Sequence, residues 1–241
     1  MSLLTSLISA WELNEASGNA LDSHGSNTLT DTNTVGSGTG LVSGTARDFE
    51  FGSAQYFTHA SNSDLQCGDI DFTFEAWLKF ENDQFYNAVF AKGIGSGREY
   101  LLYRNQDASG HLTWAVGGTQ LDSGVTITAG TWYHAVCWYD ATADQLGVAV
   151  NDGTPVTTSL SGGAATNTDD FRLGSAPDAG GLHWDGLIGP VRFWKRVVTS
   201  GERTTLYNSG AGLAYSSFGG GGGGGIIPVF LNHYRQMGIS G

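Results

Sequence analysis

The segment 71–80 places the strongest constraint on the fold, because its apolar and polar residues alternate almost without interruption. One face would carry Phe72, Phe74, Ala76, Leu78 and Phe80, and the other would carry Asp71, Thr73, Glu75 and Lys79. A period of two is typical of a β-strand with one buried face. We therefore predict a strand here, with the aromatic face in a core and the second face open to solvent or to a partner.

Short runs of the same kind recur along the chain and are separated by clusters of Gly, Asn, Asp and Ser. The further strands that they predict cover residues 7–13, 47–51, 86–92, 98–104, 111–116, 132–140, 145–150 and 187–196. The segments 107–110 and 151–153 predict tight turns, because Asn, Asp and Gly tolerate positive φ. Many short strands with little helix are typical of an antiparallel β-sandwich, and 241 residues suit one such domain.

One helix is predicted, over residues 200–208. Thr199 and Glu202 have the spacing of a capping box, and Gly210 follows as a stop signal. We expect this helix to cap the sandwich.

The charge balance restricts the partners of the chain. Lys and Arg number 11 against 23 Asp and Glu, which gives a net charge of −12, and no local basic patch interrupts this excess. Nucleic acid and anionic membrane surfaces would be repelled, and no apolar run approaches the roughly 20 residues that cross a bilayer. Residues 1–10 contain no positive charge and do not form a recognisable secretory signal peptide.

Cysteine and histidine show no pattern of a metal site. Cys67 and Cys137 lack paired spacing, and we expect free, partly buried thiols. The six histidines are scattered along the chain. His134 lies in an aromatic strand, so we expect a packed, hydrogen-bonded residue rather than a general base.

Composition changes abruptly after Phe218. Seven glycines, 219–225, precede an apolar segment, 226–241, which divides the chain into a sandwich (1–218), a flexible tether and a tail. We expect the tail to dock on another protein subunit by strand addition or groove filling. Its docking side chains would be Ile226, Ile227, Val229, Phe230, Leu231 and Tyr234. The alternative is that the tail folds back onto its own sandwich.

Five segments together resemble laminin G-like and concanavalin A-like domains. They are AWELNEASGNALDSHGSNTL, DFTFEAWLKF, GTWYHAVCWYD, NDGTPV and WDGLIGPVRFWKRVVTSGE, in the order expected of that superfamily and within residues 7–212. The resemblance implies a jelly-roll of two curved sheets, whose members mostly bind glycans, proteins or surfaces and sometimes catalyse. It also implies a structural role for Trp77, which stands where the family pattern has tryptophan. Fold alone does not select among these functions.

The resemblance further suggests a calcium site, because some relatives hold Ca²⁺ at one end of the sandwich. Asp22 and Asp185 match positions of acids in the family pattern, and the loop from Asp22 to Asn27 is rich in oxygen atoms. Calcium takes about six to eight oxygen ligands, so Asp22, Asn27 and Asp185 are the predicted metal residues. The alternative is that this loop makes only turn hydrogen bonds.

A glycan site would need exposed aromatic rings with polar neighbours. Trp114 is assigned to the core, because it shares a strand face with Leu112 and Val116. Tyr103, at a strand end, and Trp184, in a Gly-rich loop, are the predicted ligand-binding residues. The alternative for both is that they cover the rim of the sandwich.

The carboxylates of Asp69, Asp71 and Glu75 superficially resemble the catalytic strand of endo-glucanases built on this sandwich. A retaining glycosidase needs carboxyl groups about 5–5.5 Å apart, whereas Asp71 and Glu75 would lie about 13 Å apart along a strand. Thr73 stands where a further acid would follow. We therefore predict a solvated strand face that does not catalyse.

Three functions agree with these observations. The first is a non-catalytic structural and adhesion module on a repetitive assembly, such as a phage virion, a tail appendage or an extracellular fibre. Its tail would anchor it, its sandwich could bind surface glycans, and its location would be extracellular or on a virion surface. The second is a soluble calcium-dependent lectin, and the third is a glycoside hydrolase.

Overall fold

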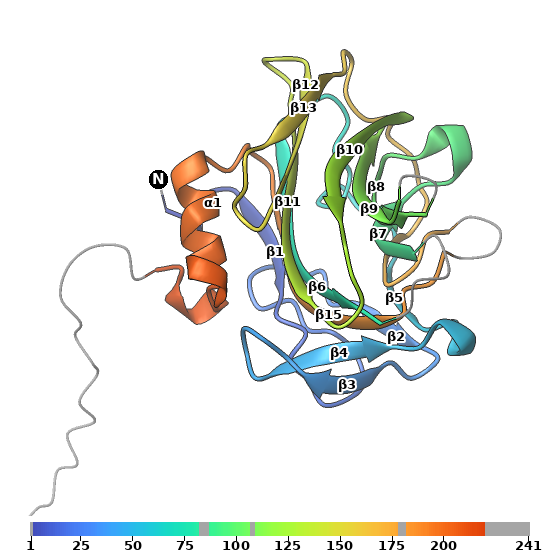
Figure 1. The fold of residues 1–241 in the computed structure, drawn as a ribbon. Coiled ribbons are helices and arrows are strands. Elements are labelled where there is room, and N and C mark those ends of the chain that lie inside the picture. The colour runs from blue at the N-terminus through green and yellow to red at the C-terminus, as the bar shows by residue number, and fades with distance from the viewer. Residues whose placement is uncertain (1, 82–86, 107–108, 178–181, 220–241) are drawn as a thin grey trace, which may run out of the picture.

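The computed structural model describes residues 2–81, 87–106, 109–177 and 182–219. Within these residues the chain forms two antiparallel sheets that pack face to face, with one α-helix outside them (Figure 1). The prediction of an all-β jelly-roll sandwich with one short C-terminal helix is confirmed.

The larger sheet has eight strands in the order β13-β12-β11-β6-β15-β4-β3, and β1 pairs with β15 beside this row. Its strands are β1 (Leu7–Trp11), β3 (Gly36–Thr39), β4 (Thr45–Phe49), β6 (Phe72–Phe80), β11 (Trp132–Asp140), β12 (Gln145–Val150), β13 (Val156–Ser159) and β15 (Gly186–Trp194). The smaller sheet has seven strands in the order β10-β9-β8-β7-β14-β5-β2. Its strands are β2 (Thr30–Thr32), β5 (Tyr56–His59), β7 (Asn87–Lys92), β8 (Tyr100–Asn105), β9 (His111–Val116), β10 (Thr119–Thr126) and β14 (Phe171–Leu173).

The strands predicted from the sequence are present, with ends that move by at most two residues in the described chain. Asn151 and Asp152 adopt φ values of 52° and 56°, as the predicted turn after β12 requires. The other predicted turn covers residues 107–110, and residues 107 and 108 lie outside the described residues. Six strands were not predicted, and these are β2, β3, β5, β10, β13 and β14.

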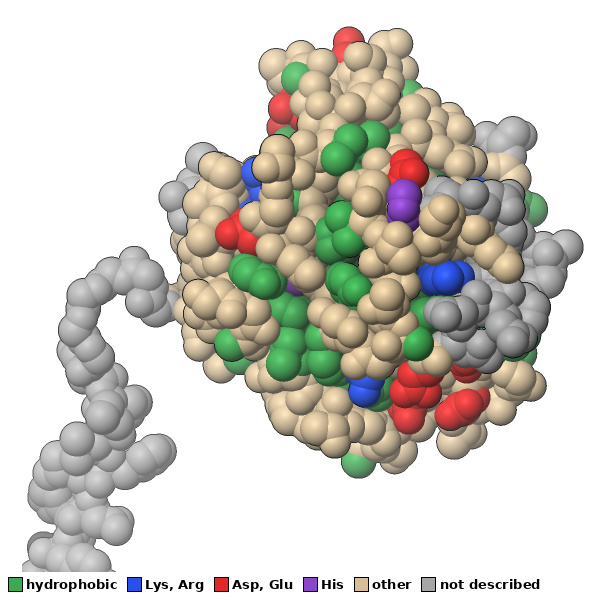
Figure 2. Space-filling view, in the orientation of Figure 1, with side chains coloured by type: hydrophobic (Ala, Val, Ile, Leu, Met, Phe, Trp, Pro, Cys, Tyr) green, Lys and Arg blue, Asp and Glu red, His purple; other side chains and the backbone are tan. Residues whose placement is uncertain are grey.

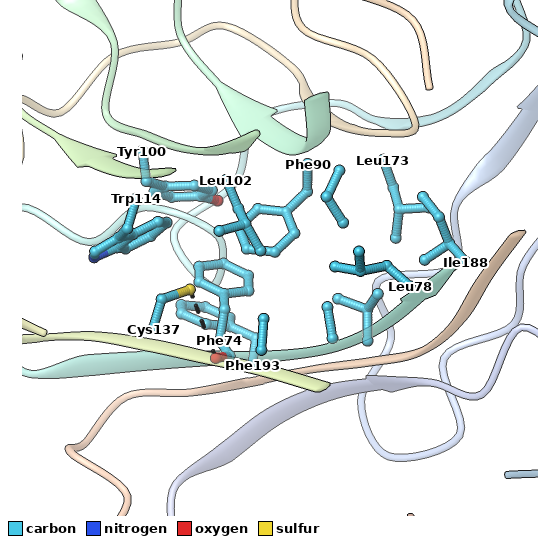
Figure 3. Packing of buried hydrophobic residues seen from close by; sticks show 14 of the residues in the cluster. Phe74, Leu78, Phe90, Tyr100, Leu102, Trp114, Cys137, Leu173, Ile188 and Phe193 are labelled. Atoms are coloured by element: carbon cyan, nitrogen blue, oxygen red, sulfur yellow. Dashed lines mark hydrogen bonds between the residues drawn. The ribbon is translucent and has the colours of Figure 1, made fainter. Parts of the chain in front are cut away.

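The main core lies between the sheets and is built on the aromatic face of β6. Phe74 stacks on Phe193 of β15, with ring centroids 4.3 Å apart, and on Phe90 of β7, at 4.5 Å (Figure 3). The ring centroid of Tyr100, in β8, lies 4.9 Å from that of Phe74. Trp114 is fully buried in the same cluster, as predicted. Side chains from both sheets therefore meet on one face of β6.

The opposite face of β6 is buried as well, so the prediction of a solvated face is wrong. Thr73, Glu75 and Trp77 are at most 1% exposed. The helix α1 (Ser200–Tyr207) and the segment after it lie over this face (Figure 1), and the Trp77 ring stacks on Tyr207 with centroids 6.0 Å apart. Trp77 therefore has the structural role that the resemblance implied.

Charged side chains on this covered face are paired with one another. Arg192 of β15 donates hydrogen bonds to Glu75 (2.9 Å) and to Glu12 (2.8 Å), and Nε2 of His134 lies 3.1 Å from Glu75. Burial alone would raise the pKa of Glu75, but the charge of Arg192 and the contact with His134 outweigh burial and lower it. His134 is a packed, hydrogen-bonded residue, as predicted.

The helix α1 begins where the sequence predicts and ends within one residue of the predicted end. Thr199 and Glu202 form both reciprocal hydrogen bonds of the capping box. The last helical residue is Tyr207, and Asn208, rather than the expected Gly210, supplies the left-handed residue that stops the helix. In the part of the chain that the structure describes, no helix is long and apolar enough to cross a membrane.

A second apolar cluster joins the two ends of the described chain beneath α1. It contains Leu3, Leu7, Ala10, Trp194, Val198, Leu206 and Phe218. Phe218, the last residue of the predicted sandwich, stacks on Trp194 with centroids 6.3 Å apart. Apart from Gly219, the predicted tether and tail lie outside the described residues, so this division of the chain stays a prediction.

Both cysteines are free thiols, as predicted, and both are buried. Burial raises the pKa of Cys67 and of Cys137 well above the ordinary value of a thiol. Because the thiolate is the reactive form, neither side chain is a candidate nucleophile.

Candidate functional site

The two aromatic residues predicted to bind a ligand are buried. Trp184 has no exposed surface, and its ring packs against Phe80 with centroids 5.5 Å apart. Tyr103 is 6% exposed, and its hydroxyl donates a 2.9 Å hydrogen bond to Gln120. Neither ring offers a face to a ligand, so this prediction is corrected: both residues pack against their own sandwich.

Asp22 and Asn27, two of the three predicted metal ligands, use their oxygen atoms within the fold. The carboxylate of Asp22 accepts hydrogen bonds of 2.9–3.0 Å from four backbone amides, three of them in its own loop. Asn27 is 1% exposed, and its side-chain oxygen accepts a hydrogen bond from Asn62. These are the turn hydrogen bonds that the alternative interpretation of this loop expects.

The third predicted ligand, Asp185, lies far from Asp22. An isolated antiparallel β-bridge joins the backbone of Asp22 to that of Trp11, and Trp11 pairs with Val191 of β15. Asp185 precedes Val191 by six residues, which corresponds to roughly 20 Å along a strand. One ion does not contact both carboxylates. Among the described residues, no group of three or more His, Cys, Asp or Glu side chains is arranged to hold a metal ion, and calcium binding stays a prediction from the sequence.

Asp185 belongs instead to an acidic surface with Asp48, Glu50 and Glu81. Burial raises the pKa of Asp48 and of Glu81, and the neighbouring carboxylates raise it further against the opposing charge of Lys79. The Oδ1 atom of Asp48 is also buried without a hydrogen-bond partner. The folded state therefore disfavours the ionised form of these two acids.

The carboxylates that superficially resemble a catalytic strand have partners within the fold. Asp69 accepts a hydrogen bond from the hydroxyl of Tyr139 (2.8 Å), and Asp71 accepts one from the backbone amide of Ala141 (2.9 Å). Glu75 is buried in the ion cluster described above. Each acid therefore has a structural role.

A cluster that the sequence did not predict lies on the outer face of the seven-stranded sheet. Strand β14 turns Phe171 and Leu173 into the core and Arg172 to the outside. The guanidinium carbon of Arg172 lies 4.6 Å from the ring centroid of Tyr56, and the His183 ring lies 6.1 Å from that of Tyr56. All three side chains are partly exposed, and we call them the Tyr56–Arg172–His183 surface.

Arg172 has hydrogen-bonding capacity that the protein does not use. Its Nε atom is buried and has no partner. Its terminal nitrogens, Nη1 and Nη2, also have no protein partner but reach solvent. The stacking of Arg172 on Tyr56 is a cation–π contact that holds the guanidinium in place and leaves Nη1 and Nη2 open to solvent.

His183 is uncharged at neutral pH. Burial lowers the pKa of His183, the backbone of Gln55 opposes this shift, and the charge of Arg172 adds to it. The ring packs edge-on against Phe51, with centroids 6.4 Å apart, and its Nδ1 is buried without a hydrogen-bond partner. The Tyr56–Arg172–His183 surface therefore carries a single positive charge.

The sequence held only a weak signal for this surface. Phe171-Arg172-Leu173 places a cation between two apolar residues, which indicates an outward side chain if the segment is a strand. Three residues are too few to establish a period. Tyr56 and His183 come from other segments and join Arg172 only through sheet pairing and the loop between β14 and β15.

Solved structures share this fold at low sequence identity. The binding domain of Paraclostridial Mosquitocidal Protein 1 aligns over 86% of this chain with a TM-score of 0.67 and 14% identity, and the alignment covers 53% of that protein. Trypanosoma rangeli sialidase aligns over 87% of this chain with a TM-score of 0.62 and 12% identity, covering 34% of that protein. Domain 4 of AbnA, a GH43 extracellular arabinanase from Geobacillus stearothermophilus solved in complex with arabinotriose, aligns over 83% of this chain with a TM-score of 0.62 and 16% identity, covering 97% of that domain.

The chain thus spans about half of the first of these proteins and about a third of the second. No curated protein matches the sequence. Residues 51–202, more than half of the chain, match the family described as the concanavalin A-like lectin/glucanases superfamily. This segment contains β6, β11 and β15, whose pairing builds the centre of the larger sheet. The resemblance read from the sequence is confirmed, and the chain belongs to the concanavalin A-like lectin/glucanase superfamily.

Proposed function

We propose that the chain is a non-catalytic carbohydrate-binding module that is displayed on a repetitive assembly and anchored there by its C-terminal tail. A phage virion, a tail appendage or an extracellular fibre would provide such an assembly, on a virion surface or outside the cell. The Tyr56–Arg172–His183 surface would bind a surface glycan. Residues 226–241 would bind other protein subunits.

The observation that carries glycan binding is a partly exposed cation–aromatic pair whose hydrogen-bond donors are unused. Sugar rings present apolar faces and hydroxyl groups, so a site for them combines aromatic surface with directed polar groups. Tyr56 supplies the first and Arg172 the second. The arabinanase domain, solved with arabinotriose, has the same fold, which supports a carbohydrate ligand here by analogy.

The partners of the acidic side chains support a non-catalytic role. Asp69 and Asp71 hold neighbouring segments of the sandwich, and Glu75 is fully buried. A general acid must instead reach the bond that it cleaves. Incubation of the chain with β-glucans tests the glycoside hydrolase alternative, since new reducing ends would contradict this part of the proposal.

Support for anchoring comes from the sequence and from the place where the described chain ends. An apolar segment behind seven glycines gains free energy by burial on another surface. Phe218 lies over the outer face of the eight-stranded sheet, whereas Tyr56 lies on the outer face of the seven-stranded sheet. The described chain therefore ends on the side opposite the proposed glycan surface.

Glycan array binding by the full-length chain tests the carbohydrate-binding function. Tyr56→Ala should weaken binding to any glycan retained by the array by about tenfold, because it removes the ring beside Arg172. Tyr215→Ala removes a partly exposed ring over the other sheet and should leave affinity unchanged. Failure of the array to retain any glycan, or equal effects of both substitutions, would contradict the proposed site.

A further inference from the structure

Arg172 differs from the other arginines of this acidic chain. Arg47, Arg192, Arg196 and Arg203 donate hydrogen bonds within the protein, and Arg98 and Arg104 have interactions of their own. Arg172 donates no hydrogen bond to the residues that the structure describes, although its Nε shares with the Nε atoms of Arg98 and Arg104 the lack of a hydrogen-bond partner. A buried donor without an acceptor, such as its Nε, destabilises the fold. Because its Nε is buried, the donors of Arg172 that an acceptor outside the protein can reach are Nη1 and Nη2.

The guanidinium of Arg172 is held in place before a ligand binds. Stacking on Tyr56 at 4.6 Å fixes its plane. Strand β14 is paired on both sides, with β5 and with β7, so the backbone beneath Arg172 is rigid. A planar fork of N–H donors matches the two oxygens of a carboxylate, and its fixed position lowers the entropy lost on binding.

The charge around Arg172 favours a ligand with an isolated negative charge. The neighbouring His183 is neutral at pH 7, and the chain as a whole carries −12. A polysulfated glycan would need several cations together, whereas the side chains that define this surface supply one guanidinium. On the one face that Figure 2 draws, Lys and Arg side chains are few and separated. One guanidinium matches one carboxylate.

We propose that Arg172 binds the carboxylate of an acidic sugar, a uronic or sialic acid residue, and that Tyr56 and His183 form the wall beside the sugar ring. This inference rests on the proposed glycan-binding function and names its ligand class. A carboxylate would use the free donors of Arg172 better than a neutral glycan does, because the hydroxyls of a neutral glycan make weaker hydrogen bonds with a guanidinium.

Matched ligands test the role of the charge. Trigalacturonate and sialyllactose are titrated into the full-length chain by calorimetry, beside their methyl esters, which keep the sugar rings and lose the charge. At least one acid should bind, and its ester should bind about tenfold to one-hundredfold more weakly. A sulfated galactan without carboxylates forms the third arm and should bind more weakly than the acid.

Matched variants test the role of Arg172. Arg172→Gln should weaken binding of the acid to the level of its ester, and Arg172→Lys, which keeps the charge but loses the fork, should give an intermediate affinity. Arg203→Gln is the control, because Arg203 stacks on Trp138 at 4.7 Å over the other sheet and its loss changes the net charge equally. Its affinity should equal that of the parent chain. Thermal unfolding confirms that each variant is folded.

The outcomes separate this inference from the function on which it rests. If neutral or esterified glycans bind as tightly as the acids and Arg172→Gln has no effect, glycan binding stands and the carboxylate inference is overturned. Tighter binding of the sulfated galactan overturns the carboxylate inference as well. If no acidic or neutral glycan binds, both proposals fail.

Discussion

At the scale of single residues, Glu75 is a carboxylate with no exposed surface. It is tolerated because Arg192, itself fully buried, donates two hydrogen bonds to it and one of its oxygens contacts His134. Arg192 also binds Glu12, which accepts a hydrogen bond from the backbone of Tyr215. The ion cluster therefore fixes the segment after α1 on the sheet.

Glu75→Gln should lower the free energy of unfolding by about 3–5 kcal/mol, because it leaves Arg192 with an incomplete partner in a buried site. Urea unfolding at pH 7 measures this change. Asp122→Asn, which removes a partly exposed contact with His111, should cost less than about 1 kcal/mol. Equal losses in the two variants would contradict a special role for the buried cluster.

Glu75 also accounts for part of the pH dependence of the free energy of unfolding. Since the pKa of Glu75 is lowered in the folded state, its contribution to stability is present above the ordinary glutamate pKa of 4.5 and is lost as pH falls through the lowered value. Glu75→Gln should therefore make stability less sensitive to pH below about 4.5.

The acidic surface around Asp48 should have the opposite pH dependence. The pKa of Asp48 and of Glu81 is raised in the folded state, so their contribution to stability falls as pH rises through these raised values. Asp48→Asn should raise the melting temperature at pH 7 and change it little at pH 3, where the parent carboxyl is already protonated. A lower melting temperature at pH 7 would contradict this expectation.

The calcium hypothesis from the sequence names Asp22, Asn27 and Asp185 as the ligands. An ion that binds only the folded state raises the melting temperature with its concentration. If calcium binds at these residues, millimolar Ca²⁺ raises the melting temperature of the parent chain relative to EDTA, and Asp185→Asn abolishes the difference. An unchanged midpoint in the parent chain would refute calcium binding.

At the scale of elements, the sequence predicts the strands whose residues alternate between apolar and polar or are rich in aromatic side chains. It misses the strands that are too short or too rich in glycine to show such a pattern. β6, β9, β11 and β12 have long or aromatic-rich runs and were placed within a residue. β3 has the sequence Gly-Ser-Gly-Thr and β14 has three residues, so neither shows a period. β3 pairs with β4, the next strand along the chain, but its Gly-rich sequence carries no strand signal of its own. β14 pairs with β5 and β7, which lie about 80 or more residues earlier, and a local pattern does not record such partners.

The same reason explains the wrong prediction for the outer face of β6. Thr73 and Glu75 are polar, and a polar face normally meets water. Their partners, Arg192 and the segment around Val198, follow more than 100 residues later. The proposed glycan surface was missed on the same ground, because Tyr56, Arg172 and His183 meet only through tertiary structure.

The capping box of α1 is an element that the sequence did predict, and its contribution can be measured. Thr199→Ala should lower the free energy of unfolding by about 1 kcal/mol, because it removes the acceptor for the backbone amide of Glu202. Ser200→Ala, at the exposed first position of the helix, serves as the control and should have little effect. Equal changes would show that the cap adds nothing to stability.

At the scale of the whole molecule, the sandwich places the proposed glycan surface and the end of the described chain on opposite faces. The outer face of the seven-stranded sheet carries the Tyr56–Arg172–His183 surface, and the outer face of the eight-stranded sheet is covered by α1 and by the last described residues. A module built in this way presents its ligand surface away from the point where the tail leaves. This geometry suits display on an assembly.

Deletion of residues 219–241 tests that arrangement. The second apolar cluster ends at Phe218, whose ring is 4% exposed, so the deletion removes none of the packing that the structure describes. The shortened chain should keep its melting temperature and its glycan affinity. Light scattering should show assemblies for the full chain, and monomers for the shortened chain and for a chain with Ile227→Asp and Phe230→Asp. The double substitution keeps the polyglycine tether and removes only apolar side chains, so it separates docking by the tail from an effect of length. A fall in the melting temperature with no change in particle size would instead place the tail on its own sandwich and overturn the anchoring role.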